Sequence, residues 1–150
     1  MKKMMSALLL TMSTVSFAAT TATLQLKGTI AQNLDISIAS ESVATSLNLT
    51  QSASNLKVAT LTEKSNSNTG YKVTLSSANS GNLKNGTFLF GYTLGYNGQQ
   101  LNLSAPQTQT YAVAAHNVQK DVTISYTGVA QESLVAGDYT DTVTFTIAAN

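Results

Sequence analysis

Cysteine is absent from this chain of 150 residues, which holds one proline and one histidine. The lack of cysteine excludes a disulfide scaffold, a thiolate metal site and a cysteine nucleophile. The single histidine, His116, excludes a metal site built from several histidines, and we expect it in an exposed loop. With Pro106 as the one proline, glycine, asparagine and serine must make the turns.

Charge is also scarce, because Asp, Glu, Lys and Arg together make up 10% of the residues. Every basic residue other than His116 is a lysine, and no stretch of the chain concentrates them. Binding to nucleic acid or to an anionic membrane needs a basic face. The sequence therefore argues against both kinds of partner.

The acidic residues suggest no catalytic or metal site. Glu41, Glu63 and Glu132 fall in predicted loops, without the spacing of an acid–base pair. Asp138 and Asp141 resemble a calcium pair, but the sequence offers no further oxygen ligands beside them. We therefore predict a protein that is not an enzyme and has no cofactor and no metal.

The first 18 residues have the pattern of a secretory signal. Lys2 and Lys3 precede an apolar run over 4–15, and Ser16-Phe17-Ala18 supplies the small residues of a cleavage site. The run is shorter than the roughly 20 residues that a membrane-spanning helix needs. We predict cleavage before Ala19 and export of the rest of the chain.

The segment Thr21–Ile30 alternates strictly between two kinds of side chain. Its apolar or small positions share one face, and its polar positions share the other, a period of two that is typical of a half-buried strand. The first face consists of Ala22, Leu24, Leu26, Gly28 and Ile30. No turn pairs this segment with the next one, so its docking partner is an open question.

Further alternating stretches predict a series of short strands. We expect strands over 33–39, 46–50, 56–62, 71–76, 87–96, 99–103, 107–115, 121–126 and 139–147. We expect polar connections over 64–70, 78–86 and 131–137. Asn97-Gly98 predicts a tight hairpin, and a change of parity after Val58 predicts a bulge.

No window in the chain after the signal shows the apolar spacing of a helix. Many short strands separated by turns favour an all-β fold, an Ig-like antiparallel β-sandwich. Several tyrosines have inward parity and are expected in the core, although together they could form a sugar-binding platform. These residues are Tyr92, Tyr96, Tyr111 and Tyr126.

The chain resembles a pilin of the chaperone–usher class. Ala22–Ile30 resembles a pilin donor strand, Asn68–Leu75 and Phe90–Gly98 resemble the central strands, and Gly137–Ile147 resembles the closing strand. The closing strand resembles most the cysteine-free alpha-type and the archaic, spore-coat-U-like fimbrial subunits, and the lack of cysteine favours the alpha-type or a divergent branch. The resemblance divides the exported chain into a donor extension at 19–32 and a sandwich domain at 33–150.

The resemblance implies a sandwich that lacks one strand and leaves a hydrophobic groove beside its closing strand. A neighbouring subunit would fill that groove with its donor strand, through Ala22, Leu24, Leu26, Gly28 and Ile30. The groove and chaperone-facing residues would be Tyr139, Val143, Phe145 and Ile147.

The same resemblance implies a structural pilus subunit that supports adhesion at the cell surface. Its partners would be identical subunits, a periplasmic chaperone and an outer-membrane usher. A second hypothesis remains open, in which the N-terminal strand completes its own domain. The protein would then be a monomeric secreted sandwich that acts as a surface, matrix or carbohydrate-binding domain.

Overall fold

The computed structural model describes residues 19–150. The predicted signal peptide, residues 1–18, lies outside the described residues. The chain divides into two units, residues 1–30, of which 19–30 are described, and Ala31–Asn150.

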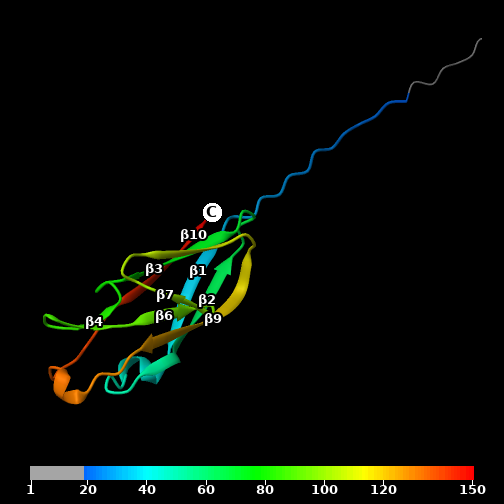
Figure 1. The fold of residues 1–150 in the computed structure, drawn as a ribbon. Coiled ribbons are helices and arrows are strands. Elements are labelled where there is room, and N and C mark those ends of the chain that lie inside the picture. Colours follow the sequence, from blue (N-terminus) through cyan, green and yellow to red (C-terminus); the bar gives the residue numbers. More distant parts are fainter. Residues whose placement is uncertain (1–18) are drawn as a thin grey trace, which may run out of the picture. The chain divides into compact units, whose positions relative to one another are not determined.

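Three antiparallel sheets make up the second unit (Figure 1). The five-stranded sheet has the order β1 (Leu34–Ser40), β2 (Ala53–Ser65), β9 (Ala115–Tyr126), β6 (Thr93–Tyr96), β7 (Gln99–Leu101). The three-stranded sheet has the order β10 (Val143–Ala149), β3 (Tyr71–Ser77), β8 (Gln107–Tyr111). A hairpin joins β4 (Asn82–Asn85) to β5 (Phe88–Gly91), and two short 3₁₀ helices, η1 and η2, cover Ser42–Thr45 and Gln131–Ser133.

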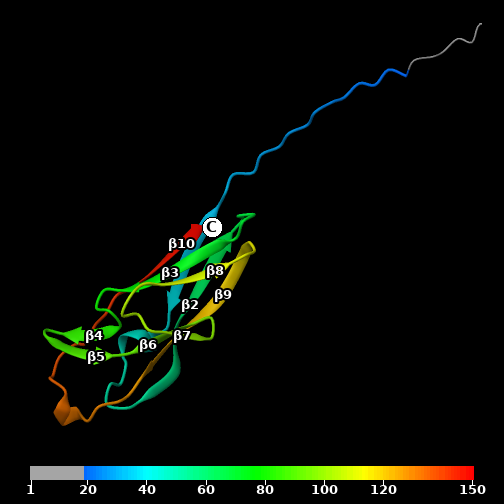
Figure 2. The ribbon, with the colours of Figure 1, turned by 45° about the horizontal axis from the view of Figure 1, so that its top comes forward.

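The two larger sheets lie against each other with one hydrophobic core between them (Figure 2). Leu61 and Ile124 come to this core from the five-stranded sheet, and Val73 and Leu75 come from the three-stranded sheet. Such alternation of inward apolar and outward polar residues holds two sheets together. The prediction of an all-β, antiparallel sandwich-like fold is confirmed.

Several boundaries differ from the predicted ones. β2 runs on to Ser65 and β9 begins at Ala115, so Glu63 lies in a strand and not in a loop. β4 forms within the stretch predicted as a polar connection, whereas 46–50 contains no strand. Polar side chains at inward positions hid the ends of β2 and β9, because a hydrophobic pattern cannot detect a buried ion pair.

The predicted strand 87–96 is divided at Tyr92 into β5 and β6, which belong to different sheets. The hairpin at Asn97-Gly98 is confirmed: Tyr96 pairs with Gln99, and the two central residues have φ of 52° and 76°. The predicted bulge after Val58 is confirmed by a register shift between Lys57 and Ala59.

The first unit is described over residues 19–30, where the chain forms no strand or helix. The strand predicted over 21–30 is thus not formed in the single chain. A strand needs hydrogen-bond partners on a neighbouring strand. No helix within residues 19–150 is both long enough and apolar enough to span a membrane.

Candidate strand-binding site

β10 and β3 share one sheet face, but their inward side chains are covered to different extents. Phe145 pairs with Leu75, and Ile147 pairs with Val73. Leu75 and Val73 are 0% exposed, while their two partners in β10 are only half-buried. The core side of β10 therefore lacks the cover that the same side of β3 receives.

β1 shows the same contrast beside β2. Its inward row is Leu34, Ile36 and Ile38, whose partners in β2 are all buried. Leu34 and Ile36 are half-buried, and Ile38 is 51% exposed. Two edge strands thus carry core-facing apolar side chains that the rest of the domain leaves partly uncovered.

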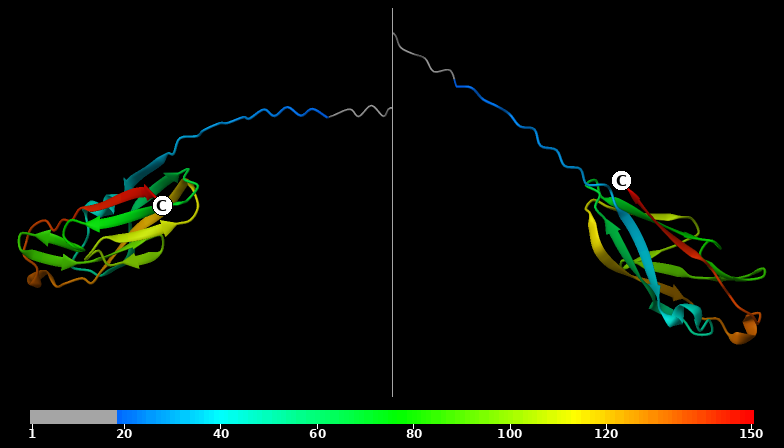
Figure 3. Two further views of the ribbon diagram at one scale, coloured as in Figure 1. Left: turned by 90° about the horizontal axis from the view of Figure 1, so that it is seen from above. Right: turned by 180° about the vertical axis from the view of Figure 1, so that it is seen from behind.

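β1 and β10 lie side by side and are the end strands of their respective sheets. They approach each other toward the C-terminal end of β10 and diverge in the other direction (Figure 3). Within residues 19–150 no strand pairing joins them. Each therefore presents a backbone edge whose N–H and C=O groups can accept another strand.

We call this region the strand-binding site and define it by the inward rows of its two edge strands. The rows are Leu34, Ile36 and Ile38 in β1 and Val143, Phe145 and Ile147 in β10.

Two adjoining hollows lie on the N-terminal side of β10. Their volumes are about 530 and 360 Å³, and both are lined by Leu47, Leu49, Gly137 and Tyr139. Three of these residues are half-buried apolar or aromatic side chains. The apolar surface of β10 is thereby continued past the start of the strand.

The predicted groove residues are brought together by the fold. Val143, Phe145 and Ile147 form one row of β10, and Tyr139 lines the hollows ahead of it. The opposite row in β1 was predicted to face inward but was not assigned to the site. Leu47 and Leu49 were predicted in a strand that does not form, so their place in the site was missed.

The predicted donor residues all lie in the first unit. Leu24 and Leu26 are each 84% exposed and Ile30 is 90% exposed. Ala22 and Gly28 are exposed as well, and a Cβ atom added at Gly28 would meet no atom within 4 Å.

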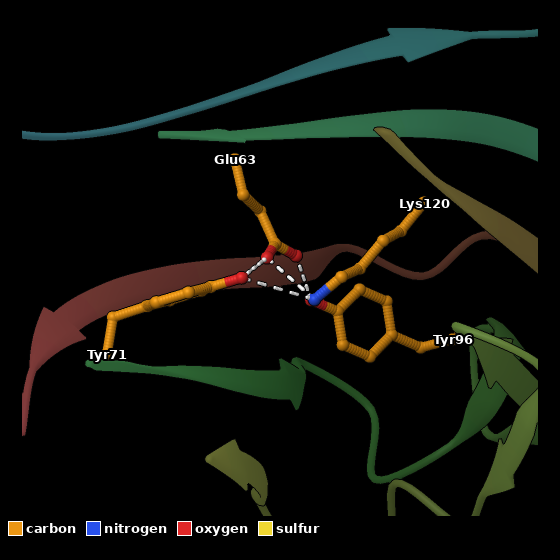
Figure 4. Close-up of polar contacts among 4 residues, drawn as sticks. All are labelled: Glu63, Tyr71, Tyr96 and Lys120. Atoms are coloured by element: carbon orange, nitrogen blue, oxygen red, sulfur yellow. Dashed lines mark hydrogen bonds and ion pairs between the residues drawn. The ribbon is translucent and has the colours of Figure 1, made fainter. Parts of the chain in front are cut away.

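A buried polar cluster lies between the two larger sheets (Figure 4). Glu63, opposite Ile36 of β1, is 0% exposed and accepts hydrogen bonds from the hydroxyl groups of Tyr71, at 2.6 Å, and Tyr96. Lys120 Nζ donates to Glu63 Oε2 over 2.7 Å. A buried carboxylate is tolerated when it is paired and hydrogen-bonded in this way.

The cluster binds the two sheets to each other. Glu63, Lys120 and Tyr96 belong to the five-stranded sheet, and Tyr71 to the three-stranded sheet. The Lys120 ammonium also lies 3.3 Å from the centroid of the Tyr111 ring in β8, a cation–π contact. Glu63 and Lys120 are closed to solvent, and their contacts fix the two sheets to each other.

Burial and hydrogen bonding to Glu63 raise the pKa of the Tyr71 and Tyr96 hydroxyl groups well above its usual range. Burial and a hydrogen bond to Asp141 raise the pKa of Tyr92 in the same way. All three tyrosines therefore stay protonated and act as hydrogen-bond donors at neutral pH.

Asp141 is the centre of a hydrogen-bond network. Its carboxylate accepts hydrogen bonds from Ser77 Oγ at 2.5 Å, Tyr92 Oη at 2.6 Å and the backbone N–H of Asn79 at 3.0 Å. These bonds join the segment before β10 to the end of β3. In the part of the chain that the structure describes, no three His, Cys, Asp or Glu residues gather as a metal site would require.

The tyrosines do not form a sugar platform. Tyr92, Tyr96 and Tyr126 are buried, which confirms the core interpretation for these three, and Tyr111 is half-buried. Another hollow, of about 630 Å³, is bordered by Ser80, Asn82, Asn102 and Ser104 and opens widely to solvent. Tyr92 and Tyr126 line this hollow, and both are buried residues of the core.

The sequence matches no model of a known protein family and no curated protein sequence.

Proposed function

We propose that this protein is a structural subunit of a surface fibre of the pilus type, which polymerises by donor-strand exchange. Residues 21–30 of one copy insert beside β10 of the next copy, and the fibre supports adhesion. Two features of one chain support the proposal. The domain has two partly uncovered inward rows, and a separate alternating segment has exposed apolar side chains.

The dimensions of the two halves agree. At about 3.3 Å per residue, an extended segment 21–30 would be roughly 33 Å long, and residues 139–149 would span roughly 36 Å. A strand added to an exposed sheet edge gains main-chain hydrogen bonds, and alternate side chains supply specificity by filling pockets. The alternation of Leu24 and Leu26 with polar residues fits this mode.

Burial of apolar side chains would favour such an insertion. Complete burial of a leucine or isoleucine side chain contributes about 1.5–3 kcal/mol. Leu24, Leu26 and Ile30 are nearly fully exposed in the chain and would all be buried on insertion. The half-buried side chains of β1 and β10 would gain cover in the same event.

Export belongs to the proposal as well. The signal-like segment at 1–18 would send the chain through the periplasm, where a chaperone would protect the strand-binding site. An outer-membrane usher would then assemble the subunits. Protection is needed because an uncovered edge strand otherwise promotes aggregation.

The test is to replace Leu24 and Leu26 together by Asp and to follow assembly by sedimentation and electron microscopy. We expect the loss of polymers with the folded domain retained, since unpaired charges in apolar pockets oppose insertion. The matched control replaces Thr23 and Gln25 by Asp, which adds the same charge on the opposite face of the segment. The control should still polymerise.

Fibres of normal length from the Leu24/Leu26 variant would contradict the proposal. So would a wild-type chain that remains monomeric and unfolds when residues 19–30 are deleted. That result would favour a self-complemented secreted sandwich.

A further inference from the structure

The loop between β2 and β3 touches the ends of both edge strands of the strand-binding site. On the β1 side, Asn66 Nδ2 donates to the carbonyl oxygen of Ala31 over 2.8 Å. Asn66 Oδ1 accepts from the backbone N–H of Asn33 over 2.6 Å. The backbone N–H of Asn66 also donates to the carbonyl oxygen of Asn33, over 3.2 Å.

On the β10 side, the same loop holds Asn150. Its Nδ2 donates to the carbonyl oxygens of Thr69 and Tyr111, each over 3.0 Å. Thr69 Oγ1 donates to the carbonyl oxygen of Asn150 over 3.2 Å, and the backbone N–H of Asn150 donates to Gly70 O over 3.4 Å. The loop thus spans from β1 to β10 at the end where the two strands approach each other.

The loop is itself well fixed. Ser67 is buried, and its backbone N–H donates to Ser65 Oγ over 3.2 Å. Gly70 has φ of +81°, and a Cβ atom at this position would lie 2.0 Å from the carbonyl oxygen of Tyr111, so only glycine fits. Asn66 therefore projects from a defined backbone.

Toward residues 31–33 the side-chain amide of Asn66 donates one hydrogen bond and accepts one, as the backbone of a neighbouring strand would. The last register pair between β1 and β2 is Leu34 with Ser65. Asn66 continues that ladder beyond its end and holds residues 31–33, the first residues of the second unit.

We propose that Asn66 is the positioning residue that fixes the path of residues 31–33, the stretch that joins the N-terminal segment to the domain. The proposal rests on the proposed function for its consequence: in a fibre, this junction connects one domain to the strand inserted in the next. Asn66 would then limit the bending between successive subunits.

The test is Asn66→Ala in the full chain, with hydrogen exchange at the amide of Asn33 as the first readout. We expect about tenfold faster exchange, because protection follows the free energy of the local opening that exposes the amide. Asn66→Asp keeps the acceptor for Asn33 but loses the donor to Ala31, so it should exchange at an intermediate rate. Asn68→Ala, in the same loop, is the matched control and should leave exchange unchanged.

The second readout is the distribution of bend angles in fibres by electron microscopy. Asn66→Ala should widen this distribution at unchanged thermal stability of the domain, a result that a general loss of folding cannot produce. Unchanged exchange at Asn33, or faster exchange with equally stiff fibres, would overturn the proposal. If the wild-type chain forms no fibres, the proposed function fails, and the exchange at Asn33 still decides the role of Asn66.

Discussion

β3 and β10 are neighbours in one sheet, yet the inward side chains of β3 are fully buried and those of β10 are not. Val73 and Leu75 of β3 are 0% exposed, and their direct partners in β10, Ile147 and Phe145, remain half-buried. The same apolar pattern therefore has two outcomes, according to whether a strand lies on both sides. β10 therefore has the apolar inward row of an interior strand, although it lies at the edge of its sheet.

We expect the largest loss of stability when the buried ion pair of Glu63 and Lys120 is broken. Lys120→Met should lower the free energy of unfolding by about 3–5 kcal/mol, because Glu63 would keep a buried charge without its partner. The double variant Lys120→Met with Glu63→Gln should recover a large part of this loss. Urea unfolding measures both.

The matched control for that prediction is Lys57→Ala. Lys57 pairs with Asp121 over 2.6 Å between the same two strands, β2 and β9, but both side chains are largely exposed. Exposed pairs contribute little, so the unfolding midpoint should not move measurably. An equal loss in the two lysine variants would show that burial is not what distinguishes the pairs.

The difference between β3 and β10 can be measured by truncating one residue in each. Leu75→Ala should cost about 2–5 kcal/mol in the unassembled chain, the usual range for a fully buried leucine. Ile147→Ala should cost clearly less there, since its side chain is already partly in water. In assembled material Ile147→Ala should cost as much unfolding free energy as Leu75→Ala. An equal cost of Ile147→Ala in unassembled and assembled material would contradict the proposed difference between β3 and β10.

Alkaline pH tests the interior through its tyrosines. The pKa of Tyr71, Tyr92 and Tyr96 is raised in the folded chain, so their stabilisation is complete below pH ~10 and is lost as pH rises above this ordinary value. The free energy of unfolding should fall above pH ~10. Tyr71→Phe should make its slope against pH shallower, by the amount that corresponds to about one proton. Urea unfolding at several pH values, with ultraviolet absorbance of tyrosinate, checks this; ionisation of all tyrosines near pH 10 without unfolding would contradict it.

Alternation alone predicted much of the fold. Leu34, Ile36 and Ile38 in β1 and Val143, Phe145 and Ile147 in β10 face inward as their parity indicated. The Asn97-Gly98 turn was predictable because both residues need positive φ.

The missed features depend on contacts between distant residues. Glu63 and Lys120 are 57 positions apart. No local sequence pattern predicts that this carboxylate and this ammonium group will form an ion pair in the core. The hydrogen bonds of Asn66 to Ala31 and Asn33 likewise join segments that are remote in sequence. The segment Thr21–Ile30 was predicted as a strand from its pattern, but a strand forms only where another strand accepts its hydrogen bonds.

The central claim is that the strand-binding site of one copy receives residues 21–30 of another. Because the chain has no cysteine, two introduced thiols would be the only ones present. Leu26→Cys combined with Ile147→Cys, oxidised mildly and run on a denaturing gel without reductant, tests the claim. Leu26→Cys with Val113→Cys is the control, since Val113 is 71% exposed and lies outside the site. We predict a ladder of disulfide-linked multimers for the first variant and not for the control; a monomer closed by an internal disulfide would contradict the account.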